Sequence, residues 1–414
     1  MRAGHAGIDP TITGGAMPHA KCALHARTRS GARTAAALRM SPPKVCVMAD
    51  SNAPGFTVQR GGILSDNMIF STFMTTGRYA VSAMLAFGLA ATCNATPATP
   101  GAQPSAAPRP VLDEEFADPF VLPLQDGSLV AFATNRRGKD GTALHVPMST
   151  SQDALHWTAP REAMPQLPAW ARADRPDLWA PEAIRAGNGY VLFFSARHAT
   201  RRRPDGLTLC IGAAVSRDAT GPYVPQPEPL TCGGEHGVID VSPVRERSAS
   251  GGEHLWLLYK TDGNCCGAPT TFVAQRLRAD AQALVGEPQV IQGAVNDQPW
   301  EGHVVEAPQM VQHAGQWYLF FAGNDYGSGA YATGYARCDS PLGPCVDAGE
   351  NPILRSRDGD PPLVGPGHQS VFEHAGRSWI AFHGWRPAEG GRPRYRAMYV
   401  LPLDWRQGRP VPRE

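Results

Sequence analysis

Five stretches of the chain repeat one pattern of apolar and polar positions. In each, a short apolar segment is followed by a polar or glycine-containing turn and then by a dense apolar segment, as in "APQMVQHAGQWYLFFAGN". Two such segments separated by a turn predict a β-hairpin. The five predicted hairpins begin at Asp118, Pro181, Ser242, Ala307 and Gln369.

The hairpins recur at an almost constant spacing. Prolines stand at positions 119, 181, 243 and 308, and a serine stands at the corresponding position 370. Further β-like pieces such as "LCIGAAVS" and "YATGYARC" lie between the hairpins, which gives each unit about four strands. This repeat predicts an all-β, five-bladed β-propeller over residues 112–414. A β-sandwich is the alternative, but it does not require equal spacing.

The chain before residue 112 follows a different pattern. Residues 74–95 have a short basic start, an apolar core and a zone of small residues, which predicts a secretory signal peptide. A buried helix at the start of the domain is the alternative. Residues 96–111 are a Pro/Ala-rich linker, and residues 1–73 are aperiodic, as expected of disorder or of a stretch upstream of the true start. We therefore expect a secreted or periplasmic protein, and we do not favour lipid anchoring at Cys93.

Composition supports short strands and excludes several partners. Gly (44) and Pro (39) are abundant, which favours many turns over long helices. Lys and Arg total 38 against 37 for Asp and Glu, so the net charge of +1 predicts no nucleic-acid partner. We expect no membrane span in the mature domain, and a monomer.

Six cysteines lie in the predicted domain, an even number that suits disulfides in an exported protein. Cys338 and Cys345 bracket the turn sequence "DSPLGP", and a Cys210–Cys232 bridge would brace another connection. Free buried thiols are the alternative for both pairs. For the adjacent Cys265 and Cys266 a bridge and two free thiols remain equally open. No Cys/His spacing resembles a zinc site.

Ionisable residues precede or begin the first strand of each predicted blade. In a propeller the innermost strands surround the central axis, so these side chains from distant parts of the sequence converge at one mouth. A single one would be explained as a strand-end cap, but three carboxylates at matching positions point to chemistry. Like charges this close raise at least one pKa, as a general acid near neutral pH requires. The residues are Asp118, Glu182, Asp240, Glu306 and His368.

The motifs "ADPF", "DLWAPEA", "VIDVSP", "EGHVVEAPQMV" and "GPGHQSVFEHAGRSWIAFHGW" together resemble glycoside hydrolase family 43. The resemblance covers residues 112–412 and implies a five-bladed propeller that acts on arabinofuranosides or xylosides. It implies that Asp118 is the general base, Glu306 the general acid and Asp240 the carboxylate that tunes the acid's pKa. Val241 departs from the family, which often has proline there. Hydrolysis with inversion would then need the base and acid about 6.5–9.5 Å apart.

Further residues are candidates for roles around the pocket, and for Trp179 and His368 the resemblance itself implies them. Trp179 and Trp300 would stack against sugar rings, although tryptophan in a strand-rich protein is often core. Asn324 would line the rim, together with Asp325 and Tyr326. Glu182 would contact substrate beside Trp179, and Arg396 would reach the pocket from the last blade. His368 would lie near a bound calcium ion on the axis, with a hydrogen-bonded core histidine as the alternative, and no cofactor is expected to be required.

We therefore expect a secreted glycosidase that releases α-L-arabinofuranosyl residues from arabinan or arabinoxylan. Gly/Pro-rich insertions at residues 198–207 and 386–394 would wall the funnel into a pocket for one terminal sugar. A β-xylosidase, an endo-arabinanase and a propeller that binds glycans without hydrolysing them are the alternatives. The carboxylate triad discriminates against the last, because glycan binding needs no acid with a raised pKa.

Overall fold

The computed structural model describes residues 107–137, 141, 143–203, 206–247, 251–388 and 394–413. The predicted upstream stretch, the signal peptide and the first part of the linker lie outside these residues and stay predictions. The described residues form β-strands and loops, with two short 3-10 turns, η1 (Gly263–Cys266) and η2 (Pro299–Glu301). Among them, no helix is both long enough and apolar enough to cross a bilayer.

The first two sheets each contain four antiparallel strands that follow one another in sequence. Blade 1 contains β1 (Phe120–Pro123), β2 (Leu129–Phe132), β5 (Pro147–Ser151) and β6 (Arg161–Glu162). A two-stranded hairpin, β3 (Arg136–Arg137) and β4 (Ala143–Leu144), extends from its second connection. Blade 2 contains β7 (Trp179–Ala186), β8 (Gly189–Arg203), β9 (Gly206–Ser216) and β10 (Val224–Pro225).

The remaining three sheets repeat the same order. Blade 3 contains β11 (Val238–Arg247), β12 (Glu253–Thr261), β13 (Phe272–Leu277) and β14 (Leu284–Val290). Blade 4 contains β15 (Val305–His313), β16 (Gln316–Gly323), β17 (Ala332–Cys338) and β18 (Cys345–Asp347). Blade 5 contains β19 (Val364–His374), β20 (Arg377–Arg386), β21 (Tyr395–Arg406) and β22 (Arg409–Pro412). The prediction of a five-bladed β-propeller is confirmed.

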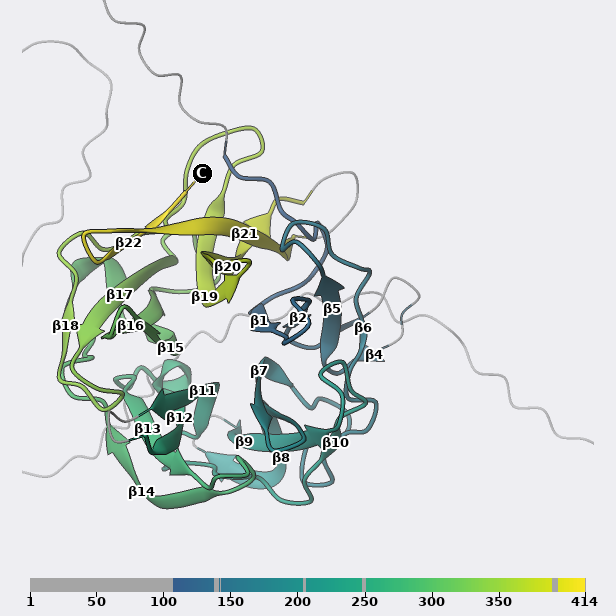
Figure 1. Ribbon diagram of the computed structural model, residues 1–414. Helices are drawn as coiled ribbons and strands as arrows, with labels where there is room; N and C mark the ends of the chain where they lie inside the picture. The colour runs from purple at the N-terminus through teal and green to yellow at the C-terminus, as the bar shows by residue number, and fades with distance from the viewer. Residues whose placement is uncertain are drawn as a thin grey trace, which may run out of the picture. The chain divides into compact units, whose positions relative to one another are not determined.

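The five first strands surround one axis. Figure 1 shows β1, β7, β11, β15 and β19 innermost, with the later strands of each blade stacked outward. Each of these strands contacts the first strand of the next blade, and β19 contacts β1, so the ring closes. Residues at the start of the five first strands are therefore neighbours across the axis.

The central part of the second strand of each blade is mainly apolar because both of its faces are buried. Successive side chains of a strand point to opposite faces. In β8, Leu192 and Phe194 pack between blades 1 and 2, whereas Val191 and Phe193 pack between blades 2 and 3. Burying a phenylalanine or leucine side chain stabilises a fold by about 1.5–3 kcal/mol. The dense apolar segments of the sequence are thus strands between two neighbouring blades.

The segment before β1 links the first blade to the last. The backbone N–H of Val111 donates to the carbonyl of Met398 at 2.8 Å, and that of Phe116 donates to the carbonyl of Arg396 at 2.8 Å. Leu112 and Phe116 also join an apolar cluster that contains side chains of β2, β20 and β21. Hydrogen bonds and apolar packing therefore both hold blade 1 against blade 5.

Three disulfides lie among the described residues. Cys210 of β9 pairs with Cys232, and Cys338 of β17 pairs with Cys345 of β18, as the cysteine spacing predicts. The adjacent Cys265 and Cys266, for which the sequence leaves both states open, are also paired. The first two bridges are buried, whereas Cys266 is exposed at the surface.

Candidate active site

Each innermost strand has a residue in the left-handed region of φ near its start. Non-glycine residues seldom adopt this conformation, and it recurs at functional sites. In β7, β11, β15 and β19 it coincides with an irregularity in the pairing to the second strand of the blade. The five residues have φ between 46° and 57° and are Asp118, Ala180, Asp240, Ala307 and His368.

The left-handed residues show which positions of the five blades are equivalent, and they differ from the equivalence that the proline spacing suggests. Pro119, Pro181 and Pro308 directly follow a left-handed residue, but in blade 3 the residue that does so is Val241. Pro243 lies further along β11, so its regular spacing from Pro181 does not mark an equivalent position. The equivalence of Asp118 and Asp240 rests instead on the shared backbone turn.

The five ionisable residues do not all occupy this position. Asp118, Asp240 and His368 are the left-handed residues themselves, whereas Glu306 lies one residue before Ala307 and Glu182 two residues after Ala180. All five are buried. Two of the blade starts are joined directly, because Asp240 Oδ2 accepts a 3.0 Å hydrogen bond from the N–H of Ala307.

Asp118 is surrounded by nitrogen atoms from blade 5, and its own N–H donates to Nδ1 of His383 at 3.2 Å. Its Oδ1 accepts a 3.0 Å hydrogen bond from Nη1 of Arg396, and it lies 3.1 Å from Nδ1 of His383 and 3.4 Å from Nδ1 of His368. Thr134 donates to its Oδ2. Burial opposes ionisation, but Arg396 and the two histidines outweigh it and hold the pKa of Asp118 well below its usual range. Asp118 is therefore an ionised carboxylate at neutral pH.

Glu306 lies in a different network. Its Oε2 accepts hydrogen bonds from Nζ of Lys260 at 3.0 Å and Nδ2 of Asn264 at 3.2 Å, and its Oε1 accepts one from the Tyr331 hydroxyl at 2.7 Å. Burial raises the pKa of Glu306, but Lys260 and the Tyr331 hydrogen bond outweigh burial, and the net direction is down. In the free protein, Lys260 therefore favours the ionised form of Glu306.

Of Asp118, Asp240 and Glu306, Asp240 is the one whose pKa is raised. Burial and repulsion from Glu306 raise the pKa of Asp240 to about 6, although His368 and Lys260 act in the opposite direction. Two interacting carboxyl groups titrate as a pair. The sequence predicts that crowding raises at least one pKa, and the group affected in the free protein is Asp240 rather than Glu306.

Glu182 is a second carboxyl group near the axis with a raised pKa. It lies on β7, and burial raises its pKa well above the usual range, with a further contribution from Asp240. Its Oε2 is buried without a hydrogen-bond partner. A neutral carboxylic acid is the form that tolerates such a position. Substrate contact by Glu182 stays a prediction.

The two predicted sugar platforms differ in their surroundings. Trp179 begins β7 beside the left-handed Ala180 and is half-buried. Trp300 packs 5.4 Å from the ring of Phe321, and a Cβ at Gly334 would lie 2.5 Å from its ring. Trp300 thus fills a space in the core of blade 4 that glycine leaves open. Stacking of either tryptophan on substrate stays a prediction.

Arg396 of blade 5 lies close to the turn after β16. Arg396 contacts Asp118, and its guanidinium lies 5.3 Å from the ring of Tyr326 and 5.7 Å from that of Trp385. Asn324 has a φ of 76° and begins the turn that carries Tyr326, which is half exposed. Arg396 therefore contacts both Asp118 and the half-exposed ring of Tyr326.

Sequence reasoning missed several residues that contact the carboxylates. They are Thr134, Lys260, Asn264, Tyr331 and His383. One signal was available for Lys260, because it directly follows the apolar run "LWLLY" in the buried part of β12. The others come from separate blades, and no local pattern distinguishes them.

The described residues contain two groups of side chains with metal-ligand spacing. One is His236 with Cys265 and Cys266, and the other is Asp297 with Glu301 and Asp347. His368 belongs to neither group. Calcium prefers six to eight oxygen ligands, so an ion beside this imidazole would need water for most of its coordination. Calcium near His368 stays a prediction, and no catalytic step below depends on it.

Comparison with known proteins identifies the family to which this architecture belongs. The model of glycosyl hydrolases family 43 matches residues 107–410, which covers all five blades. The chain belongs to glycosyl hydrolases family 43. The match includes Asp118, Asp240 and Glu306, so the family-43 domain contains the whole carboxylate cluster.

Relatives of this family-43 chain include characterised enzymes. An extracellular endo-α-(1→5)-L-arabinanase of Thermotoga petrophila is 27% identical over 231 residues, which is 49% of this chain and 47% of the relative. The alignment thus spans about half the length of that relative. A thermostable family-43 glycoside hydrolase of known structure has a TM-score of 0.60 at 25% identity, with 72% of this chain and 93% of that chain covered.

A second solved structure supports the fold alone. An endo-1,4-β-xylanase from Bacteroides thetaiotaomicron has a TM-score of 0.56 at 24% identity and covers 74% of this chain and 97% of its own. Proteins with different named substrates therefore share the propeller. The substrate has to be argued from the pocket of this chain.

Proposed function

We propose that this protein is a secreted glycosidase that removes terminal α-L-arabinofuranosyl residues from arabinan or arabinoxylan with inversion. The observation that carries the proposal is the opposite environment of two buried carboxyl groups. The surroundings of Asp118 keep it ionised at neutral pH. Those of Asp240, near Glu306, raise its pKa to about 6. An ionised base and a proton-holding acid pair are what inverting hydrolysis needs.

Asp118 would act as the general base. Arg396 donates a hydrogen bond to Oδ1 of Asp118, and the pKa of Asp118 lies well below neutrality, so this carboxylate can accept a proton from water throughout the physiological range. Burial lowers the pKa of His383 to about 4, which keeps its ring neutral. The water would attack the anomeric carbon while its proton moves to Asp118.

Glu306 would act as the general acid. Lys260 favours its ionised form in the free protein, so Glu306 has to gain a proton before it can donate one to the leaving oxygen. Asp240 is the neighbouring group that holds a proton near pH 6. We assign Asp240 the role of pKa modulator, because its negative charge near Glu306 favours the protonated form of Glu306.

Arabinofuranosyl specificity rests on the family and on the shape of blade 2. The family contains a relative named as an arabinan-cleaving enzyme. The long β8–β9 hairpin reaches blade 3, where Arg203 pairs with Asp262 beside the turn that contacts Glu306. A hairpin in this position can wall one side of the funnel and favour a terminal sugar. A xyloside and an internal arabinan linkage are the rival substrates.

Secretion is supported by the disulfides. Three bridges among the described residues suit an oxidising compartment. The named relative is described as extracellular. The signal peptide and the question of lipid anchoring at Cys93 concern residues outside those described.

Hydrolysis of aryl glycosides tests the proposal. We expect faster release of nitrophenol from the α-L-arabinofuranoside than from the β-D-xyloside, and the inverted anomer as the first product seen by NMR. Asp118→Asn should lower kcat roughly 10²–10⁴-fold on every substrate. Glu306→Gln should lower it similarly on arabino-oligosaccharides but much less on a dinitrophenyl glycoside, whose leaving group needs no acid.

Each alternative has its own outcome in this assay. Faster xyloside cleavage would overturn the substrate assignment, and cleavage of debranched arabinan into oligosaccharides would indicate endo action. A retained anomer would overturn the mechanism. Binding of arabino-oligosaccharides without hydrolysis would show a glycan-binding propeller instead.

A further inference from the structure

The turn that carries Asn264 also carries a disulfide between neighbouring residues. The η1 turn comprises Gly263–Cys266, and Cys265 is joined to Cys266. A bridge between adjacent cysteines closes a small ring around a single peptide unit, so it restricts the backbone of that unit. The disulfide is therefore placed to restrict the conformation of η1.

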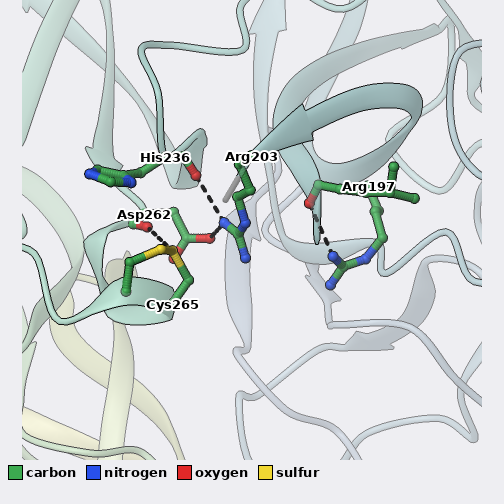
Figure 2. Close-up of a disulfide and its surroundings, with 7 residues drawn as sticks. Arg197, Arg203, His236, Asp262 and Cys265 are labelled. Carbon is green, nitrogen blue, oxygen red and sulfur yellow. Dashed lines mark hydrogen bonds and ion pairs between the residues drawn. A yellow bond between two sulfur atoms is a disulfide. The ribbon is translucent and has the colours of Figure 1, made fainter. Parts of the chain in front are cut away.

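Contacts on the outer side hold this turn in place. Figure 2 shows Arg203 between the carbonyl oxygen of His236 and the carboxylate of Asp262, with the disulfide next to them. Sγ of Cys265 lies 3.3 Å from the carbonyl oxygen of Asp262. The N–H of Asp262 in turn donates to the carbonyl of Gly237 at 3.0 Å. Residues from the connection before β11 and from β8 thus brace the disulfide.

The inner side of the same turn reaches the proposed general acid. Nδ2 of Asn264 donates to Oε2 of Glu306 at 3.2 Å, while Oδ1 of Asn264 accepts from Nζ of Lys260 at 2.8 Å. Asn264 directly precedes Cys265, so the backbone that the disulfide restricts also sets where this amide lies. A change in η1 would therefore alter the contacts of both Glu306 and Lys260.

We propose that the Cys265–Cys266 disulfide positions Asn264 against Glu306, and that its reduction by a dithiol lowers catalysis reversibly. The proposal rests on the assignment of Glu306 as the acid. In the step, a dithiol breaks the S–S bond, gives one proton to each cysteine sulfur, and is itself oxidised to a disulfide. Cys265 and Cys266 are positioning residues and do not contact the reacting atoms.

Accessibility makes this bridge the one that a reductant attacks first. Thiol–disulfide exchange requires the attacking thiolate to reach a sulfur atom. Cys266 is exposed, whereas both cysteines of the Cys210–Cys232 bridge and both of the Cys338–Cys345 bridge are buried. Mild dithiothreitol should therefore reduce Cys265–Cys266 while the other two bridges remain closed.

The test compares oxidised and reduced full-length protein by two independent measurements. Alkylation and peptide mapping first confirm that, of the six cysteines of the propeller, only Cys265 and Cys266 are open. The ¹³C carboxyl signal of Glu306, assigned by its loss in Glu306→Gln, is then titrated in both forms. Reduction should raise the pKa of Glu306, because a donor to its charged form is lost. This measurement requires no activity, so it stays informative if no glycoside is hydrolysed.

The second measurement is kcat/KM against pH on an arabino-oligosaccharide. Reduction should lower it roughly tenfold, as expected for the loss of one charge-assisted hydrogen bond, and should move the basic limb to higher pH. Asn264→Ala should give the same change and should respond no further to dithiothreitol. The Cys265→Ala/Cys266→Ala double variant should also be insensitive to the reductant.

An unchanged Glu306 titration in protein with both thiols open would overturn the proposal, whether or not the protein is active. So would a full rate and an unchanged pH profile in the reduced enzyme. A lower rate with no movement of the basic limb would likewise contradict it, because a general loosening of the fold would do the same. Absence of hydrolysis by the oxidised protein would instead count against the proposed function.

Discussion

Lys260 is a charged side chain with no exposed surface, and its ammonium lies 3.0 Å from Glu306. A buried charge is tolerated only when it is paired and hydrogen-bonded, and removal of one partner costs about 3–5 kcal/mol. The pairing lowers the pKa of Glu306, which opposes protonation of a general acid. At the scale of single residues, stability and catalysis therefore make opposite demands on this carboxylate.

Lys260→Met should have separate effects on the pH profile of catalysis and on the free energy of unfolding. Without the ammonium, burial dominates and the pKa of Glu306 rises, so the basic limb of kcat/KM should move to higher pH. In the wild type the depressed pKa stabilises the fold above the unfolded pKa, and this stability is lost as pH falls. In the variant the sign reverses, and the free energy of unfolding should fall as pH rises, with a loss of about 3 kcal/mol at pH 8.

Urea unfolding at pH 5 and pH 8 measures this reversal. Arg278→Met is the matched control, because it removes a cation from the exposed Arg278–Asp280 pair. That change should alter stability by less than about 1 kcal/mol at either pH. An equal loss for Lys260→Met at both pH values would contradict the electrostatic explanation.

At the scale of elements, the same left-handed backbone position recurs in every blade and carries different side chains. It presents a carboxylate in blades 1 and 3 and an imidazole in blade 5, but only the methyl groups of Ala180 and Ala307 in the other two blades. In those blades the acids come from neighbouring positions, Glu182 and Glu306. The strand start is thus a shared scaffold, and the chemistry depends on which side chain each blade places beside it.

The connection between blades 3 and 4 carries a second acidic group. Glu301 of η2 and Asp347 of β18 lie together with Asp297, and burial raises the pKa of Glu301 to about 7 and that of Asp347 to about 6. Oε1 of Glu301 and Oδ1 of Asp347 are buried without hydrogen-bond partners. Ionisation of these groups in the folded protein is therefore unfavourable.

Asp347→Asn should flatten the pH dependence of stability. Both folded pKa values are raised, so the wild type loses stability as pH rises from about 4 to about 7. The substitution removes one charge, and its amide can donate to Glu301. We expect a higher Tm than the wild type at pH 8 and little difference at pH 4.

Differential scanning calorimetry in EDTA checks this prediction, since the chelator prevents a cation from neutralising the group. Asp280→Asn, which removes an exposed carboxylate, is the control and should leave the pH dependence unchanged. A lower Tm for Asp347→Asn at pH 8 would show that the carboxylate is favourable there.

At the scale of the whole molecule, five apolar clusters of described residues hold the ring, one between each pair of neighbouring blades. The strands of blade 1 come from the start of the domain, and those of blade 5 from its end. Within the described ranges, no strand is exchanged between these two blades. Their junction therefore depends on packing and on the segment before β1.

Truncation tests this closure. A chain that begins at residue 107 should be as stable as the full chain, because it keeps Leu112 and Phe116. A chain that begins at residue 117 should lose several kcal/mol, since deletion of one buried aromatic side chain alone costs about 3–5 kcal/mol. Phe116→Ala in the longer chain isolates the packing contribution. Equal urea midpoints for the two truncated chains would show that the segment does not close the ring.

The repeat in the sequence was sufficient to predict five blades because strand pairing within a blade is local. Alternation along β8 and its equivalents, glycine-containing turns and a regular period all describe one hairpin and its neighbours. The same reasoning found Asp118, Asp240 and Glu306 and two of the three disulfides. It placed Pro243 wrongly as an equivalent of Pro181, because spacing counts residues and cannot detect the backbone turn at Asp240.

Fold class, blade number and the type of chemistry could be inferred from the sequence, since they depend on short-range pattern and on which side chains can ionise. The partners of each carboxylate were decided only when the chain folded into a ring. Arg396 meets Asp118 across 278 residues, and Lys260 meets Glu306 across 46. A pKa depends on burial and on charges a few ångströms away, and closure of the ring sets both.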